Sequence, residues 1–192
     1  MASLTERMVG AAKLDVHTYE EVEADTTATS QALGVVVLSS VAAGIGASLG
    51  ALGEGNIGFV VGTLIGYTVV ALLGWVIWAF VTYIVGTKLL PEPATKSNMG
   101  ELLRTTGFSQ APGLLRVVGV VPFLGPILSS LVNIWMLVAF IIAVRQALDY
   151  QSTWRAIGVC VIGWVIQVVF VVVLVGILAA VIGIGAATGA GG

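Results

Sequence analysis

The chain has 192 residues, of which 58% are hydrophobic and only 9% are charged. Soluble domains carry about 25% charged residues, so this composition excludes an ordinary water-exposed surface. The formal net charge of −2 excludes a strongly basic nucleic-acid-binding protein, and we expect no nucleic-acid partner. The single cysteine, Cys160, excludes an intramolecular disulfide and a metal site built from several cysteines. The predicted solvent for most of the chain is therefore membrane lipid.

Residues 1–30 are polar and mixed in charge, which predicts that the chain does not open with a cleavable signal peptide. Leu4, Met8 and Ala11 recur at helical spacing and predict a short amphipathic helix on the membrane or on the cytoplasmic face of the protein. The stretch from Asp15 to Asp25 is acidic and holds no Lys or Arg. It is interpreted either as a solvated linker or as a surface that docks a partner. The candidate partner-binding residues are Tyr19, Glu20, Glu21, Glu23 and Asp25.

Two apolar runs, residues 31–52 and 57–85, are joined by a connection too short for anything but a tight turn. They predict a hairpin of two transmembrane helices. Small residues spaced four apart allow helix backbones to approach closely in lipid. We expect this hairpin to be held by close packing at Gly46, Gly50, Gly62 and Gly66.

The longest internal polar loop runs over residues 86–111, where Pro91 and Pro93 break any helix. Ser97 or Asn98 is predicted to cap a short amphipathic helix that ends near Phe108.

The next apolar run contains three helix-breaking residues, Pro122, Gly125 and Pro126, which predict a bent hairpin. Residues 127–145 are long enough to cross a bilayer, whereas residues 113–124 are too short for a standard helix to do so. Either this third segment is short and tilted, or it starts earlier and places Arg116 inside the membrane. The first alternative is favoured, with the Arg116 side chain extending to the cytoplasmic interface.

Residues 156–187 form a fifth apolar run, longer than a bilayer requires, which predicts a helix that tilts or frays at its glycines. Residues 188–192 are expected to be a flexible tail. Lys and Arg are confined to residues 1–30, 86–112 and 145–155, with Arg116 at the border of the second stretch, which predicts that these stretches are cytoplasmic. Five crossings then place the N-terminus inside and the C-terminus outside.

The sequence contains no motif for a nucleophilic hydrolase, a zinc protease or a phosphate-binding loop, and its one histidine, His17, lies in the polar N-terminal segment. An enzyme is not expected, nor is a cofactor or a metal. Arg116, Asn133 and Gln167 are the candidate polar residues in or beside the membrane. Asn133 and Gln167 are expected to bond to each other across two helices, or else to line a polar path near the bent hairpin.

Three stretches of the chain resemble the Yip domain family of small Rab/Ypt-interacting membrane proteins, in its prokaryotic branch. They are the run from Tyr19 to Leu33, the run from Gly107 to Leu124, and the block from Ile134 to Ala156. The resemblance extends from about Arg7 to Val175. It implies five transmembrane helices and a non-enzymatic role in membrane organisation or trafficking. The eukaryotic branch engages prenylated small GTPases through a longer N-terminal region, which this chain lacks, so that partnership is not carried over.

The predicted fold is therefore an all-α bundle of about five transmembrane helices with a short amphipathic N-terminal region. Its predicted location is a prokaryotic cytoplasmic membrane, where lipid and protein partners on the cytoplasmic face are expected. The predicted function is a scaffold or adaptor, and the alternative is a small transporter or channel with a polar path near the broken hairpin.

Overall fold

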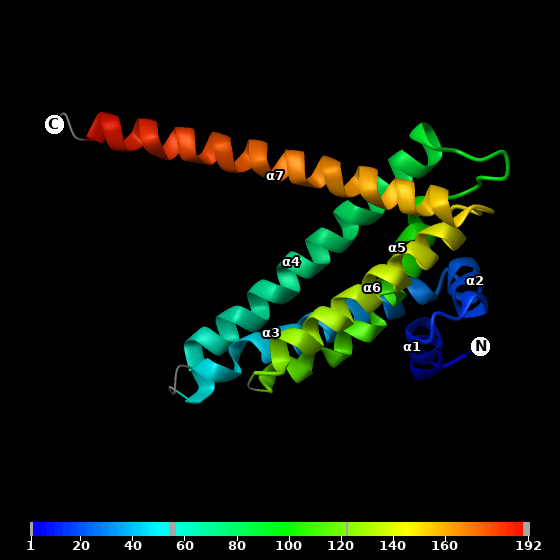
Figure 1. The fold of residues 1–192 in the computed structure, drawn as a ribbon, viewed down its shortest axis with the longest axis horizontal. Helices are drawn as coiled ribbons and strands as arrows, with labels where there is room; N and C mark the ends of the chain where they lie inside the picture. The colour runs from blue at the N-terminus through cyan, green and yellow to red at the C-terminus, as the bar shows by residue number, and fades with distance from the viewer. Residues whose placement is uncertain (1, 54–56, 122, 190–192) are drawn as a thin grey trace.

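The computed structural model describes residues 2–53, 57–121 and 123–189, and it is helical throughout its regular structure (Figure 1). Its elements in chain order are α1 (Leu4–Ala12), α2 (Val16–Ala24), α3 (Ala28–Gly53), α4 (Ile57–Ile84), the π-helical turn η1 (Val85–Leu89), α5 (Met99–Phe108), the 3-10 helix η2 (Ala111–Val120), α6 (Gly125–Ala147) and α7 (Thr153–Gly189).

Four of these helices are long and apolar enough to cross a membrane. They provide spans at Ala28–Ser48, Ile57–Leu89, Gly125–Ala147 and Thr153–Phe170. Large apolar side chains are exposed along all four spans, as a lipid-facing surface requires. The prediction of an all-helical, polytopic membrane protein is confirmed.

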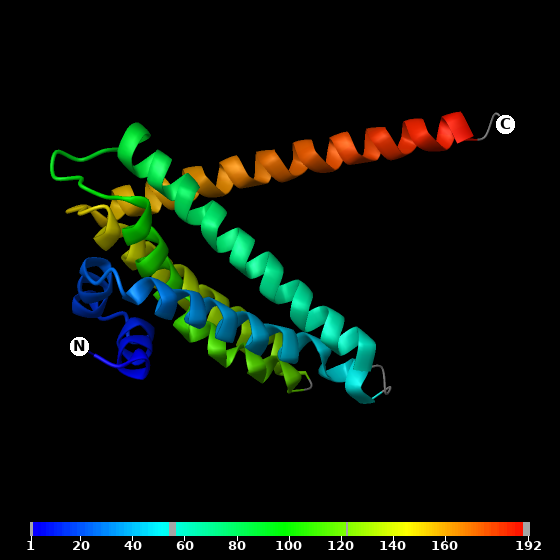
Figure 2. The ribbon, with the colours of Figure 1, turned by 180° about the vertical axis from the view of Figure 1, so that it is seen from behind.

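The two ends of the bundle differ in character (Figure 2). The polar end carries α2, α5, the loop between η1 and α5, and the link between α6 and α7, while α1 packs against α2, η2 and α5. The turn end carries the end of α3, the start of α4 and the start of α6. Seven of the chain's 8 basic residues lie in or directly after α1, in η1, in α5, or in the loops and helix ends of the polar end, and Arg116 is the exception.

The segment expected as a short third crossing is a broken helix. Asn98 is the N-cap of α5. Its side chain accepts a hydrogen bond from the Glu101 backbone N–H, and its own backbone N–H donates to the Glu101 carboxylate. The chain then continues as η2, which starts at Ala111, carries Pro112 in its first turn and packs between α3 and α6. A 3-10 helix rises about 2.0 Å per residue against 1.5 Å for an α-helix. The structure places η2 at Ala111–Val120, where residues 113–124 were expected, and its 10 residues extend to about 20 Å.

The glycines expected to hold the α3–α4 hairpin have other roles. A Cβ added at Gly46 would collide with the carbonyl oxygen of Arg116 in η2, whereas a Cβ at Gly62 or Gly66 would meet nothing within 4 Å. The close contact between α3 and α4 lies instead at Gly44, where a Cβ would stand 2.9 Å from Leu64. The side-chain environment of Gly50 lies outside the described residues.

Three chain segments meet backbone to backbone near the turn end. A Cβ at Gly119 would stand 3.5 Å from Gly46 Cα, and one at Gly125 would collide with the backbone of Gly119. Pro126 occupies the first turn of α6, where its missing N–H leaves no helical hydrogen bond unmade. Pro122 lies outside the described residues. The predicted bend at Gly125 and Pro126 is thus also the place where α3, η2 and α6 pack most closely.

The polar end is fastened by hydrogen bonds between segments distant in sequence. The Tyr150 hydroxyl lies 2.9 Å and 2.6 Å from the carbonyl oxygens of Gly86 and Leu90, which ties the α6–α7 link to η1. Arg155 pairs with Glu92 at 3.4 Å and so holds the start of α7 to the loop after η1.

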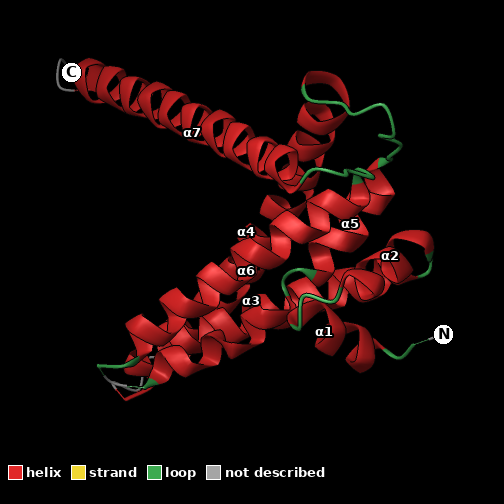
Figure 3. Ribbon diagram, turned by 45° about the vertical axis from the view of Figure 1, so that its right-hand side comes forward, coloured by secondary structure: helices red, strands yellow, loops and turns green. Residues whose placement is uncertain are grey.

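α7 packs against α4, η1 and α6 through its first part and then diverges from the other helices (Figure 3). Gly163 faces the Trp78 ring of α4, where an added Cβ would lie 2.8 Å from the indole. The helix is continuous to Gly189, so it does not fray at its glycines, and its length is accommodated by tilt relative to α6.

Candidate functional site

The acidic stretch is not a solvated linker, because it forms helix α2. Asp15 caps this helix by accepting a hydrogen bond from the backbone of His17. Tyr19 and Val22 are fully buried in a core that also contains Ala11 and Phe108. Burial raises the pKa of Tyr19, whose hydroxyl donates to the carbonyl of Ala11. α1 and α2 are therefore an integral part of the folded molecule.

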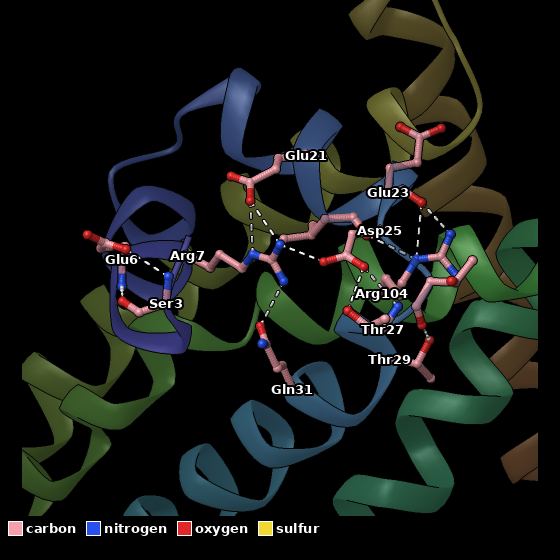
Figure 4. Close-up of polar contacts among 12 residues, drawn as sticks. Ser3, Glu6, Arg7, Glu21, Glu23, Asp25, Thr27, Thr29, Gln31 and Arg104 are labelled. Carbon is pink, nitrogen blue, oxygen red and sulfur yellow. Dashed lines mark hydrogen bonds and ion pairs between the residues drawn. The ribbon is translucent and has the colours of Figure 1, made fainter. Parts of the chain in front are cut away.

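Arg7 joins the N-terminal segment to the start of α3 (Figure 4). Its guanidinium is 2% exposed and contacts Glu21 at 2.8 Å, Asp25 at 2.7 Å and Gln31 at 2.9 Å. Burial alone would lower the pKa of Arg7, but the two carboxylates more than offset it and raise it. Hydrogen bonds from Thr27 and from Arg7 lower the pKa of Asp25 to about 2. Two of the candidate partner-binding residues are thus already engaged within the chain.

Arg104, on α5, holds the C-terminal end of α2 (Figure 4). Its guanidinium is buried and donates to the backbone carbonyls of Val22, at 2.9 Å, and Glu23. These carbonyls belong to the last turn of α2, where no further helical N–H is available to them. The Trp135 indole donates in the same way to the carbonyl of Ala12, the last residue of α1, at 2.8 Å. Side chains of the bundle thus cap both N-terminal helices.

Four carboxylates of α2, α5 and the α6–α7 link form no ion pair with a Lys or Arg of the described residues. We call Glu20, Glu23, Glu101 and Asp149 the acidic patch. Burial and the charges of Asp149 and Glu101 raise the pKa of Glu23 to about 7, although Arg104 opposes this shift. The Glu20 side chain is 60% exposed, and its polar neighbours are Gln146 at 3.5 Å and His17 at 3.8 Å. Asp149 adopts a left-handed backbone conformation, with φ 52°, directly after α6.

The membrane-embedded candidates are brought together only in part. Arg116 donates from Nε and Nη2 to the Asn133 side-chain oxygen, at 3.1 Å and 2.7 Å. Gln167 lies on α7 and has no hydrogen-bond partner among the described residues, so the expected Asn133–Gln167 bond is not formed. Asn133 is eight residues into α6, about 12 Å from the turn end and about 21 Å from the polar end. The sequence predicted that the Arg116 side chain extends to the polar interface, but it bonds instead to the exposed Asn133 side chain partway along α6.

Two cavities meet at this pair. One, of about 440 Å³, lies toward the turn end, and its lining includes Tyr67, Gly125 and Ser129. The other, of about 950 Å³, lies toward the polar end between α3, α4, α6 and α7. Its lining is largely aromatic and apolar and includes Trp75, Trp78, Met136, Phe140 and Trp164. Arg116 and Asn133 line both cavities.

Sequence reasoning missed several residues that organise these sites. The sequence prediction used Arg7 and Arg104 only as positive charges that mark the inner face. Their structural roles come from burial in the fold, and the sequence around a single arginine does not reveal whether it is buried. Glu101 and Asp149 lie far from α2 in the sequence, so their approach to Glu23 depends on the packing of α5 and α6. A signal for α2 was present, since Asp15 followed by Tyr19 and Val22 is a helix cap followed by two apolar residues three apart.

The fold and these sites define a polytopic helical membrane protein with a helical N-terminal segment docked on the polar end. No group of three or more His, Cys, Asp or Glu residues in the described part of the chain is arranged to hold a metal ion. The Yip1 domain family model matches residues 16–175, and the chain belongs to this family. Comparison with curated proteins and with solved structures finds no match.

Proposed function

We propose that this protein is a non-enzymatic scaffold or adaptor in a prokaryotic cytoplasmic membrane, and that it recruits a protein partner to the acidic patch. Its family is associated with membrane trafficking, which supports a role in membrane organisation. The observation that carries the proposal is the firm docking of α2, which presents Glu20 and Glu23 beside Glu101 and Asp149 on one exposed end of the molecule.

The positions of the basic residues support the orientation that this function needs. Lys and Arg cluster on the polar end and on α1, and the positive-inside rule assigns such an end to the cytoplasm. The N-terminus then lies in the cytoplasm and the C-terminus outside. The acidic patch faces the compartment in which soluble partners are made.

Charge supports a basic partner. The carboxylates of the acidic patch repel one another because they are held close together. Arg104 offsets only part of this repulsion, because its guanidinium donates its hydrogen bonds to backbone carbonyls. A Lys or Arg side chain from a partner would relieve this repulsion and strengthen binding. Glu21 and Asp25 bind Arg7 and are better regarded as structural.

The test is purification of the intact protein from native membranes in a mild detergent, followed by mass spectrometry of the proteins that accompany it. A triple variant, Glu20→Gln, Glu23→Gln and Asp149→Asn, removes three negative charges without touching the Arg7 or Arg104 contacts. We expect a partner recovered with the natural protein to be depleted at least about tenfold with this variant, and more so as salt is raised.

The matched control is Glu54→Gln, which removes a carboxylate from the α3–α4 connection, outside the described residues. It should leave recovery of the partner unchanged. Equal recovery with the triple variant would overturn the proposal. Deleting residues 1–30 is a poorer test, because it also removes Ala11, Tyr19 and Val22 from the core.

A second candidate function, a small transporter or channel, is favoured by one observation. The two cavities share Arg116 and Asn133, so this pair lies where a cavity toward the turn end meets a cavity toward the polar end. An arginine there disfavours cations, so the matching solute would be an anion. Anion flux into liposomes through the natural protein, lost in Arg116→Gln, would favour this function over the scaffold.

A further inference from the structure

No carboxylate of the described residues forms an ion pair with the Arg116 guanidinium. The sequence has no Asp or Glu between Glu101 and Asp149, and Asn133 offers only a neutral oxygen. Two of the five guanidinium N–H groups point at that oxygen, and the others have no hydrogen-bond partner among the described residues. A positive charge at this depth costs at least about 2.5 kcal/mol when isolated in hydrocarbon, so a counter-charge there is strongly favoured.

The two cavities differ in the chemistry of their linings. The lining of the cavity on the turn-end side includes Tyr67, Ser129 and Arg116. The cavity on the other side is lined by the aromatic rings of Trp78, Phe140 and Trp164. A polar compartment, a cation and a long apolar compartment thus follow one another from the turn end inward. An amphiphile whose acyl chains point to the middle of the bilayer has the same order of parts.

We propose that this groove binds one anionic phospholipid from the leaflet at the turn end. The phosphate contacts Arg116 and the Asn133 amide, its headgroup occupies the smaller cavity, and an acyl chain lies in the larger one. Arginine suits this role because its planar fork of donors binds phosphate oxygens in pairs. A net anionic headgroup fits better than a zwitterionic one, because no carboxylate of the neighbouring spans is available to receive a choline or an amine.

The α7 residues that line the larger cavity all belong to the first part of that helix, and the lipid enters past them from the bilayer without crossing water. The inference does not depend on the partner proposed for the acidic patch, which lies at the other end of the molecule. It also holds whether or not a solute passes the Arg116–Asn133 pair.

The experiment is native mass spectrometry of the full chain in mild detergent, titrated with phosphatidylglycerol or with phosphatidylcholine of the same acyl chains. We expect one tightly held phosphatidylglycerol per chain and weaker retention of phosphatidylcholine. Arg116→Gln should weaken phosphatidylglycerol binding about tenfold, the effect of losing one charge-assisted contact. Lys96→Gln removes an equal charge from the exposed loop and should have no effect. Retention of the two lipids to the same extent, or unchanged binding in Arg116→Gln, would overturn the proposal.

A second measurement uses the natural protein alone, in case Arg116→Gln does not fold. Phosphatidylglycerol brominated in its acyl chain should quench the tryptophans of the larger cavity at a lower mole fraction than brominated phosphatidylcholine. Equal quenching would contradict a specific site. Displacement of the bound lipid by millimolar inorganic phosphate would show a site for free anions and would likewise overturn the lipid assignment. The Glu20→Gln and Glu23→Gln changes should leave both readouts unaltered, so that this proposal and the scaffold proposal can fail separately.

Discussion

Glu23 is the side chain at which burial and like charge act in the same direction. Its pKa of about 7 lies above the usual value for a glutamate, 4.5, because the carboxylate is partly buried and lies near the negative charges of Asp149, Glu101 and Glu20. The positive charge of Arg104 opposes this shift. The folded state therefore binds this proton more tightly than the unfolded state does. Stability contributed by the protonated form is complete below about pH 4.5 and is lost as the pH rises toward 7.

Glu23→Gln should remove this loss. We expect the variant and the natural protein to melt at similar temperatures at pH 5, and the variant to be more stable by about 1 kcal/mol at pH 8, a value reduced for partial exposure. Thermal unfolding in one detergent at both pH values is the measurement. Asp25, with its pKa near 2, does not titrate in this range and so does not obscure the result. A variant less stable than the natural protein at pH 8 would contradict the charge argument.

At the scale of elements, the contact between α3 and η2 depends on the absence of a side chain at one position. Gly46→Val should destabilise the protein by more than about 2 kcal/mol, because its Cβ would collide with the carbonyl oxygen of Arg116. Gly62→Val provides a matched control, since it adds the same atoms to an α-helix where nothing lies within 4 Å. We expect a large fall in melting temperature for the first variant and little change for the second. Similar melting temperatures would show that α3 and η2 do not pack at Gly46.

Hydropathy and prolines were enough to predict the spans that became α3, α4, α6 and α7. A cap at Ser97 or Asn98 and an end near Phe108 were enough to place α5. The sequence could not show which segment each glycine packs against. In lipid the packed face and the lipid-facing face of a helix are both apolar, so nothing in α3 or α4 distinguishes Gly46 from Gly62. The 3-10 form of η2 was missed for a related reason, because it depends on packing between two neighbouring helices. Arg116 and Asn133 were chosen as polar residues in apolar runs, but their pairing required the fold.

At the scale of the whole molecule, the N-terminal segment is held to the bundle by a few long-range hydrogen bonds. Arg104→Gln shortens the side chain and removes the contacts to the Val22 and Glu23 carbonyls, 82 and 81 residues away in the sequence. We expect α1 and α2 to detach more often, so that trypsin cleaves after Lys13 several times faster in mild detergent. Lys96→Gln also removes one basic residue and one tryptic site, but from an exposed loop. It should leave cleavage after Lys13 unchanged, and equal rates in the two variants would argue against the role of Arg104.

The backbone contact among Gly46, Gly119 and Gly125 has a mechanical consequence. No side chains stand between these segments to change rotamer, so α3, η2 and α6 can shift relative to one another only by breaking the contact altogether. α7 has no comparable contact beyond its first part. The larger cavity is lined by α4 and by the first part of α7 as well as by α3 and α6. The pair of Arg116 and Asn133 therefore lies on the part of its wall that this backbone contact holds in place, whichever side a molecule enters from.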